Sequence, residues 1–161
     1  MKHTTAIERT SDREIVVTRT FNAPAHVVFE AWSNPELFQR WWTPKSFGIT
    51  FVSCEADVRT GGTYRFLFTH ASLEQPMAFF GRYIEVTPPS RIVWTNEETP
   101  GGPVSTVTFE DRGGTTLQVL SELYPSKEAL DEALATGSSG TNGAPEQFEQ
   151  LDLVLVTLVG S

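Results

Sequence analysis

Between residues 49 and 123 the chain consists of six short segments rich in β-branched and aromatic residues, each followed by a few turn-forming residues. Antiparallel neighbours can be joined by connections this short, whereas parallel strands need a crossover of a dozen or more residues. The sequence Asp-Arg-Gly-Gly at 111–114 is a typical hairpin turn. The spacing therefore predicts a consecutive antiparallel meander, which needs another element to cover its apolar face. The six segments are 49–58, 63–70, 77–86, 91–96, 104–110 and 115–123.

Two short helices are predicted between a first strand and the meander. Residues 14–21 have the β-branched composition of a strand, and residues 1–12 show no periodicity and are predicted to be a flexible N-terminal tail. Positions 22–24 and 34–35 each combine an asparagine with a nearby proline, which caps a helix and suits its first turn. The second helix is expected to end at about Trp42. Residues 13–161 are predicted to form one domain, long enough to bury a core.

The last part of the chain is predicted to be helical and to lie across the sheet. Residues 126–137 favour one helix, and a longer one begins at Pro145, with Phe148, Leu151 and Leu155 at helical spacing. The β-branched end of the chain leaves a terminal strand as an alternative, but the continuous apolar stripe favours the helix. We therefore predict an α+β helix-grip fold, in which a curved antiparallel sheet of six to seven strands is wrapped around a long C-terminal helix.

Alternating aromatic side chains on the predicted strands indicate a cavity between the sheet and the last helix. Residues of one parity face the same side of a strand, so these rings would point inward together, and on the last strand Leu117 and Val119 are expected to do the same. Aromatic rings suit a rigid pocket wall. The alternative is that they only fill the core, as most apolar stripes do. The residues predicted to contact a small apolar or aromatic ligand are Trp41, Tyr64, Phe66, Phe68, His70, Phe79, Tyr83, Trp94, Phe109, Phe148, Leu151 and Leu155.

Two adjacent tryptophans, Trp41 and Trp42, stand in an aromatic stretch that also contains Pro35 and Pro44. The whole chain has four tryptophans, so this pair marks the stretch as part of the core or of a cavity rim. We expect Trp41 to point inward at the end of the cavity and Trp42 to seal the segment against the sheet.

Four strings of the sequence carry a resemblance that covers nearly the whole chain from residue 14 onward. They are FNAPAHVVFEAWSNPELFQRWW (21–42), DVRTGGTYRF (57–66), FFGRYIEVTPPSRIVWT (79–95) and VTFEDRGGTTLQV (107–119). Together they resemble the START-like, helix-grip superfamily, in the stand-alone bacterial form of the branch named after the activator of heat-shock-protein-90 ATPase. The resemblance implies a ligand-sized, largely apolar cavity. The branch commonly opens its last helix with Gly-Trp, whereas this chain has Gly143 and Ala144, so one large ring is missing from the cavity mouth.

Three functions are open at this point, and binding of a small molecule is favoured. Members of the superfamily range from binders to cyclases and other enzymes, so a cyclase or hydrolase that uses His70 as an acid or base is one alternative. No Ser, Cys or carboxylate stands at a recognisable triad spacing from His70, so no catalytic residue is predicted. The other alternative is an interaction module that activates a chaperone ATPase, which the family name alone implies. With one cysteine and three histidines, the chain predicts no metal site and no cofactor.

The charge and the ends of the chain restrict its partners and its location. A net charge of −8 argues against nucleic acid or an anionic membrane as a partner, since either would need a basic face. The polar N-terminus has no apolar signal-peptide core, and the longest apolar stretch, 151–159, is too short to span a bilayer. We therefore expect a cytoplasmic protein. The apolar end of the chain leaves a homodimer possible.

Overall fold

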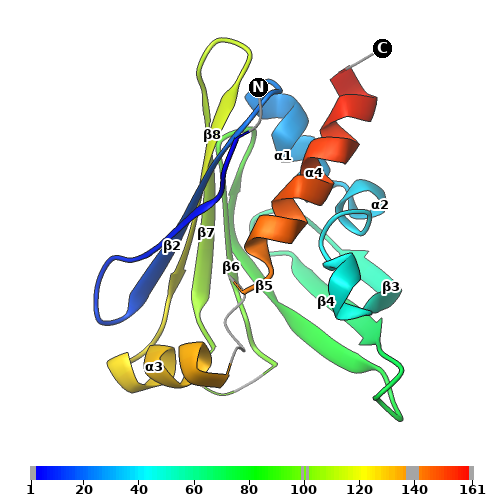
Figure 1. Cartoon of the computed structure of the whole chain (residues 1–161), viewed down its shortest axis with the longest axis vertical. Coiled ribbons are helices and arrows are strands. Elements are labelled where there is room, and N and C mark those ends of the chain that lie inside the picture. Colours follow the sequence, from blue (N-terminus) through cyan, green and yellow to red (C-terminus); the bar gives the residue numbers. More distant parts are fainter. Residues whose placement is uncertain (1–2, 99, 101, 137–141, 160–161) are drawn as a thin grey trace.

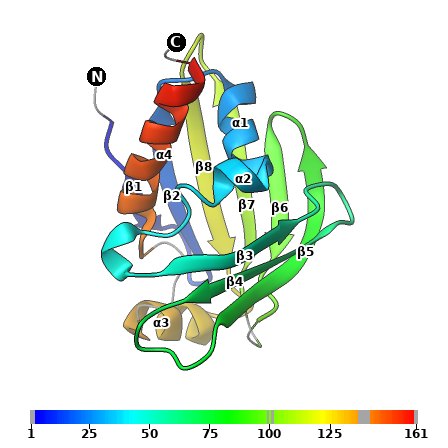
Figure 2. The same cartoon turned by 90° about the vertical axis from the view of Figure 1, so that its right-hand side faces the viewer.

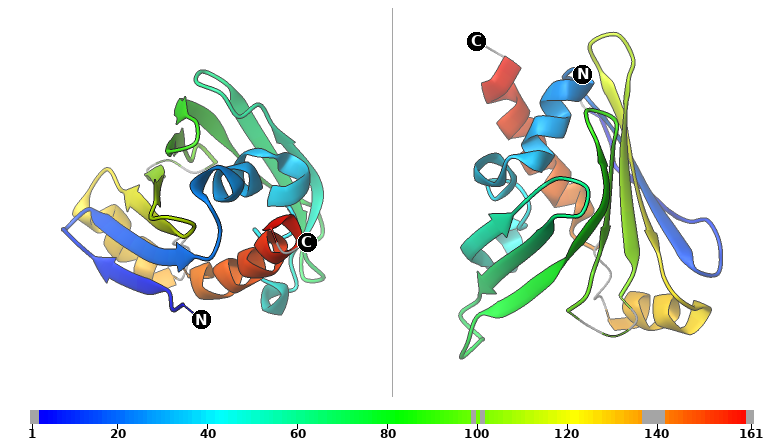
Figure 3. Two further views of the ribbon diagram at one scale, coloured as in Figure 1. Left: turned by 90° about the horizontal axis from the view of Figure 1, so that it is seen from above. Right: turned by 180° about the vertical axis from the view of Figure 1, so that it is seen from behind.

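The computed structural model describes residues 3–98, 100, 102–136 and 142–159. It places one curved antiparallel sheet around a C-terminal helix (Figure 1), and the sheet curls around the helices when it is seen from above (Figure 3). Within the described residues the sheet has eight strands in the order β1-β2-β8-β7-β6-β5-β4-β3. The predicted meander and the α+β helix-grip fold are confirmed. The strands are β1 Ala6–Arg9, β2 Glu14–Phe21, β3 Thr50–Ala56, β4 Thr63–Thr69, β5 Met77–Thr87, β6 Arg91–Thr95, β7 Val104–Asp111 and β8 Thr116–Leu123.

Strand β1 was not predicted from the sequence. It pairs with β2, so that Ala6 lies opposite Thr18 and Arg9 opposite Ile15. All its residues are exposed, so no face of the strand is buried and no alternation marks it in the sequence. The strand forms because its backbone groups pair with the open edge of β2. In the described part of the chain the sheet therefore has eight strands rather than six or seven, and Ala6–Arg9 is part of the sheet rather than of an unstructured tail.

The helices lie on the concave side of the sheet and at its lower end (Figures 1 and 2). Helix α2 is shorter than predicted, ending at Phe38 instead of near Trp42. After Phe38 the chain tightens into turns in which the amide of Trp41 donates to the Phe38 carbonyl at 3.2 Å. No helix among the described residues is both long and apolar enough to cross a membrane. The helices are α1 Ala25–Ser33, α2 Pro35–Phe38, α3 Lys127–Thr136 and α4 Ala144–Val159, with a 3-10 turn at Lys45–Phe47.

Helix α4 crosses the concave face of the sheet and packs against β2 and α1. Phe148, Leu151 and Leu155 are all buried on its inner side. The Phe148 ring meets the ring of Phe21, on β2, edge to face with 5.7 Å between centroids. The last segment of the chain is therefore a helix and not a terminal strand, as the continuous apolar stripe predicted.

Arg19 joins β2 to α4 through a buried charge. Its side chain is 1% exposed, and its Nη1 and Nη2 both donate to the carboxylate of Asp152 on α4, with 3.3 Å between Nη1 and Oδ1. The guanidinium carbon also lies 4.8 Å from the centroid of the Phe21 ring. A guanidinium is tolerated inside a protein only when it has partners of this kind. Arg19 is thus the single charged residue on the buried face of β2, and it is the residue that pairs with α4.

A glycine and a register shift allow the sheet to bend between its two halves. The pairing of β5 with β6 shifts between Tyr83 and Glu85, and such irregularities increase the local twist. At Gly81 a Cβ atom would lie 2.1 Å from the Thr95 carbonyl oxygen on β6, so only glycine permits this close approach. As a result β3 and β4 run across β7 and β8 rather than alongside them (Figure 2).

Candidate functional site

A cavity of about 580 Å³ lies between the bent half of the sheet and the elements that cover it. Strands β4 to β8 form one side, and the other is formed by α1, α2, α3, the segment 42–44 and the first turn of α4. Packed protein interiors seldom contain voids much larger than a water molecule, whereas small-molecule pockets occupy roughly 300–1,000 Å³. The aromatic residues that line the cavity are Trp32, Phe38, Trp42, Tyr64, Phe66, Phe68, Phe79, Tyr83, Trp94 and Tyr124.

Many of these rings form a wall in which each ring is held by its neighbours. Phe38 of α2 stacks on Trp42 with 4.7 Å between centroids and lies 5.3 Å from Phe66 of β4. Trp32 of α1 lies 5.7 Å from Trp94 of β6. A ring packed on several sides keeps its position, because rotating it would displace the rings next to it. The wall is therefore a preformed apolar surface of the kind that ligand sites use.

Polar groups gather next to α3, where β6 and β8 end and β7 begins. Asn96 donates from Nδ2 to the Ser105 hydroxyl at 3.0 Å and to the Pro103 carbonyl at 2.7 Å. Ser105 and Glu122 are cross-strand partners and are 1% and 7% exposed. The Tyr124 hydroxyl donates to Oε1 of Glu122 at 3.3 Å. The cavity thus combines an apolar wall with a polar end.

Burial controls the ionisation of three groups at the cavity. It raises the pKa of Tyr64 and of Tyr83 above the ordinary value of a phenol, so both hydroxyls stay protonated at neutral pH and well into the alkaline range. The Tyr64 hydroxyl donates to the Thr95 carbonyl at 2.7 Å. Burial also raises the pKa of Glu98, while hydrogen bonds from backbone amides act in the opposite direction. The two tyrosines are therefore neutral hydrogen-bonding groups, not bases.

The structure brings together half of the residues predicted to contact a ligand. Phe109, Phe148, Leu151 and Leu155 lie instead in the packed core, each at most 4% exposed. Within the described residues α4 contributes Gln147 to the lining, so the cavity lies at the N-terminal end of this helix and not under its middle. The predicted residues that do line the cavity are Tyr64, Phe66, Phe68, Phe79, Tyr83 and Trp94.

The two adjacent tryptophans differ from their predicted positions, because Trp42 and not Trp41 is among the described residues that line the cavity. Trp41 is fully buried, its indole Nε1 donates to the Ala31 carbonyl at 3.0 Å, and its ring lies 6.2 Å from that of Phe148. Trp42 lines the cavity and stacks on Phe38. The reason is that α2 ends before both residues, so the helical spacing used to predict their directions no longer applies.

His70 borders a smaller pocket near Phe47 and Leu73, and it is not among the described residues that line the larger cavity. Its Nδ1 accepts a hydrogen bond from the Ser72 amide at 3.0 Å and lies 2.7 Å from the Ser72 hydroxyl. These contacts fix the ring at a turn beside the smaller pocket, which shares Ile49, Phe68 and Met77 with the lining of the larger cavity. In the described part of the chain no three His, Cys, Asp or Glu side chains are grouped in a way that could hold a metal ion.

The polar end of the cavity was missed because the wrong face of β8 was predicted to point inward. Leu117 and Val119 were expected on that face, but Gln118 and Glu122 occupy it. Gln118 is the cross-strand partner of Phe109, and directly opposed residues share one face of a sheet. The hairpin register between β7 and β8 could therefore have identified Glu122 as an inward-facing residue.

The loop that carries Trp42 is fastened to α4 by the Gln150 side chain. Nε2 of Gln150 donates to the carbonyls of Trp41 at 3.0 Å and of Thr43 at 2.9 Å. Oε1 of the same amide accepts from the backbone N–H of Lys45 at 3.0 Å. One buried side chain thus satisfies three backbone groups of the loop and fixes the position of Trp42 in the cavity wall.

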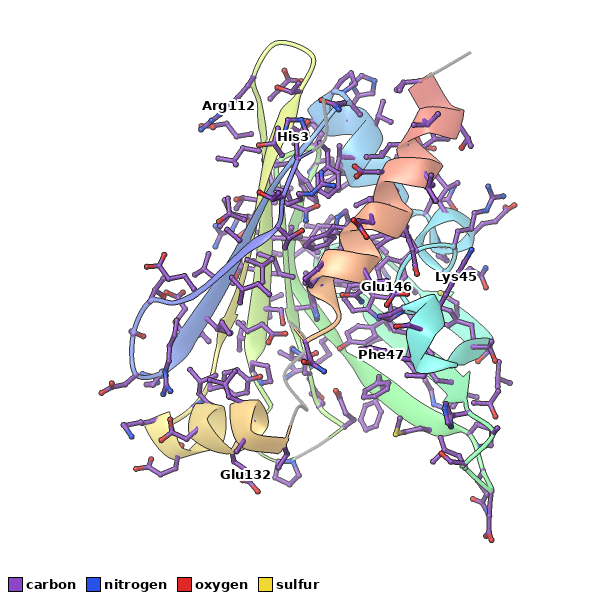
Figure 4. All side chains as sticks on the ribbon, in the orientation of Figure 1. His3, Lys45, Phe47, Arg112, Glu132 and Glu146 are labelled. Atoms are coloured by element: carbon purple, nitrogen blue, oxygen red, sulfur yellow. The ribbon has the colours of Figure 1, made fainter. Side chains whose placement is uncertain are left out.

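A second contact holds the same loop at the surface. Glu146, on the first turn of α4, faces the turn at Lys45 and Phe47 (Figure 4). It accepts a hydrogen bond from the Ser46 amide at 2.9 Å and another from the Ser46 hydroxyl. These hydrogen bonds lower the pKa of Glu146, because they stabilise the ionised carboxylate.

Solved structures of bacterial proteins share this fold over nearly their whole length. A crystal structure of a protein from Rhodobacter sphaeroides has a TM-score of 0.83 and 23% identity, and the match covers 96% of this chain and 99% of that one. A protein from Mycobacterium smegmatis has a TM-score of 0.79 and 23% identity, with 96% and 99% covered. A protein from Nitrosomonas europaea has a TM-score of 0.79 and 18% identity, with 94% and 99% covered. At these identities the likeness shows the fold.

None of the curated proteins matches the chain. A family model described as "Activator of Hsp90 ATPase homolog 1-like protein" matches residues 22–155. The matched range begins just before α1 and ends within α4, so it contains every residue that lines the cavity. The chain therefore belongs to the family of activator of Hsp90 ATPase homolog 1-like proteins, which have the START-like fold.

Proposed function

We propose that the protein binds a small apolar or aromatic molecule in the cavity. The observation that carries this proposal is a space of about 580 Å³ between the sheet and its helices, at the place where aromatic rings converge. Unfilled apolar space is destabilising, because the atoms that line it lose their contacts. A ligand of the right size would restore those contacts.

The chemistry of the lining supports this use. Ligand sites are mostly apolar, with a few polar groups that fix the orientation of the bound molecule. Here the rings supply the apolar surface, and Asn96, Ser105, Glu122 and Tyr124 supply polar groups at one end. A ligand with an apolar body and one polar group would match both parts of the cavity.

Binding without turnover is better supported than the two other functions. An enzyme that depends on His70 would need this side chain at the cavity, and His70 borders the other pocket. Activation of a chaperone ATPase is suggested by the family description alone, and a family does not fix the function of each member. A cytoplasmic location, the lack of a nucleic-acid or membrane partner, and a homodimer stay predictions.

A neutral fluorescent probe, N-phenyl-1-naphthylamine, tests the proposal. We expect a saturable rise in fluorescence with the wild type. Leu120 lines the cavity from β8, so in Leu120→Trp the larger side chain should occupy ligand space and weaken binding by at least about tenfold.

Leu117→Trp is the matched control, because it makes the same exchange on the opposite face of the same strand. Its probe binding should equal that of the wild type. The proposal fails if the wild type shows no saturable binding, or if Leu120→Trp, shown to be folded by near-ultraviolet circular dichroism, binds as tightly as the wild type.

A further inference from the structure

The smaller pocket that His70 borders adjoins the larger cavity. It has a volume of about 370 Å³, which is within the range of small-molecule sites. Ile49, Phe68 and Met77 border both spaces. Phe68 and Met77 are cross-strand partners on β4 and β5, so their side chains lie next to each other on one face of the sheet. The two spaces therefore meet at one small group of side chains.

Several large apolar side chains are exposed around the smaller pocket. Phe47, Leu73 and Met77 are 40%, 38% and 41% exposed, and all three line this pocket. Single exposed apolar residues need no explanation, but a group of them around one hollow indicates a binding surface. Met77 also has an unbranched side chain that adapts its shape to its surroundings. It is therefore the residue at the boundary that can yield to a bound molecule.

His70 offers a directional hydrogen-bond donor at the smaller pocket. The Ser72 amide donates to Nδ1 of His70 at 3.0 Å, and an amide N–H can only donate, so Nδ1 carries no proton. The proton of the neutral imidazole is then on Nε2. No described residue accepts a hydrogen bond from Nε2. This N–H is therefore available to a ligand.

Gly48 leaves space beside this donor. A Cβ atom at Gly48 would lie 3.2 Å from Nε2 of His70, so a side chain there would press against the ring. The φ of 68° at Gly48 is also in the left-handed region, which favours glycine. Its neighbours Phe47 and Ile49 both line the smaller pocket. The Nε2 edge of His70 thus faces the segment that forms one wall of this pocket.

We propose that the ligand is an elongated molecule, with an apolar body in the larger cavity and an arm in the smaller pocket that carries a carbonyl oxygen. This inference rests on the proposed function and adds the shape and the chemical class of the ligand. The carbonyl oxygen accepts a hydrogen bond from Nε2 of His70, while the carbon atoms of the arm pack against Leu73 and Met77. A ligand of this kind would cover apolar side chains that are otherwise exposed.

Three compounds separate the arm from its carbonyl group. 2-Methylnaphthalene supplies the body, 2-butylnaphthalene adds an apolar arm, and 4-(2-naphthyl)butan-2-one has an arm of the same length with a carbonyl oxygen. Displacement of N-phenyl-1-naphthylamine measures the affinity of each. A buried methylene strengthens binding by about fourfold. We therefore expect 2-butylnaphthalene to bind the wild type at least about tenfold more tightly than 2-methylnaphthalene.

Filling the smaller pocket tests where the arm lies. Among the described residues Leu73 lines this pocket and not the larger cavity. Leu73→Trp should therefore remove most of the affinity gained from the butyl arm and leave the affinity for 2-methylnaphthalene unchanged. Leu123→Trp is the matched control, because Leu123 is 42% exposed and lies outside both linings. Phe47→Trp fills the same pocket from another element, so the test stays decisive if Leu73→Trp does not fold.

Removing the donor tests where the carbonyl oxygen lies. His70→Phe keeps a planar ring and removes the Nε2–H group. It should lower the affinity for the ketone relative to that for 2-butylnaphthalene by about fivefold, the contribution of a typical neutral hydrogen bond. This ratio cancels a change in the shape of the pocket, which affects both compounds. His26→Phe is the matched control, because His26 is exposed on α1 and lies outside both linings.

The outcomes distinguish this inference from the proposed function. If none of the compounds displaces the probe, the proposed function fails and the inference fails with it. If 2-methylnaphthalene binds but the butyl arm adds no affinity, or if folded pocket-filling variants keep the gain, the inference is overturned while the proposed function stands. The same holds if Leu123→Trp removes the gain as fully as they do. If His70→Phe keeps the ratio, or if His26→Phe lowers it equally, the hydrogen bond to His70 is overturned.

Discussion

The space between the sheet and its helices has two halves with similar inward-facing residues and different packing. Under α4, Phe21 and Phe148 meet in a filled core and neither is exposed. Under α2 and α3, rings such as Phe66 and Trp94 surround about 580 Å³ of space. The covering elements differ, since α4 has 16 residues and α2 has 4. Apolar alternation therefore predicts which face of a strand is buried, but the length and path of the covering element decide whether that face is filled.

The adjacent tryptophans give the sharpest form of this comparison. Trp41 belongs to the filled half, so Trp41→Ala should lower the free energy of unfolding by about 5 kcal/mol, the upper end for a buried ring. Probe binding by the remaining folded protein should change less than in Trp42→Ala, because Trp41 supports the wall rings but does not itself line the cavity. Trp42→Ala should cost less stability and should weaken probe binding by about tenfold, because it removes part of the cavity wall. Urea unfolding measures the stability of each variant, and probe titration measures its binding. Loss of probe binding in folded Trp41→Ala would contradict the distinction between the filled half under α4 and the cavity half under α2 and α3.

Two phenylalanines test whether a side chain beside the cavity contributes less to the free energy of unfolding than one in the packed core. Phe109 and Phe68 both lie on strands and are both 4% exposed, but only Phe68 lines the cavity among the described residues. Phe109→Ala should cost about 4 kcal/mol and Phe68→Ala about 2 kcal/mol, because Phe68 borders the cavity and part of its surface therefore has no packed atoms to lose. Denaturant unfolding compares the two variants directly. Equal losses would mean that the cavity side is packed as tightly as the core.

A pH titration tests the contact between Glu146 and Ser46, which holds the loop carrying Trp42 against α4. Here we expect the smallest effect. The folded protein holds the pKa of Glu146 below its usual 4.5 through its hydrogen bonds to Ser46. The unfolded chain therefore binds this proton more readily, so the contact stabilises the fold above about pH 4.5 and is lost as the pH falls through the lower folded value. The difference in melting temperature between wild type and Glu146→Gln should shrink toward zero on acidification. The control Glu128→Gln, at an exposed site on α3, should show no such trend.

Most of the fold could be predicted from the sequence, because its elements bury one face. The strand Glu14–Phe21 and the final helix have apolar residues at the spacing that their geometry requires. Strand β1 could not be predicted, since all of its residues are exposed and its pairing involves only the backbone.

The site was less predictable, because it depends on where elements end and how strands align. Trp42 could not be placed in the cavity wall until the end of α2 at Phe38 was known. Glu122 could not be placed until the register of β8 against β7 was known. Residues on α3 reach the cavity because of the path of the chain, and no local pattern encodes that path.

A crystal structure determined under xenon pressure tests the central claim most directly, because xenon binds in apolar cavities and is visible by its electron density. We predict that xenon occupies the space between Trp94 and Phe66, and that none binds beneath α4 around Phe148. Side chains that fill the first space, with no xenon there, would contradict the account.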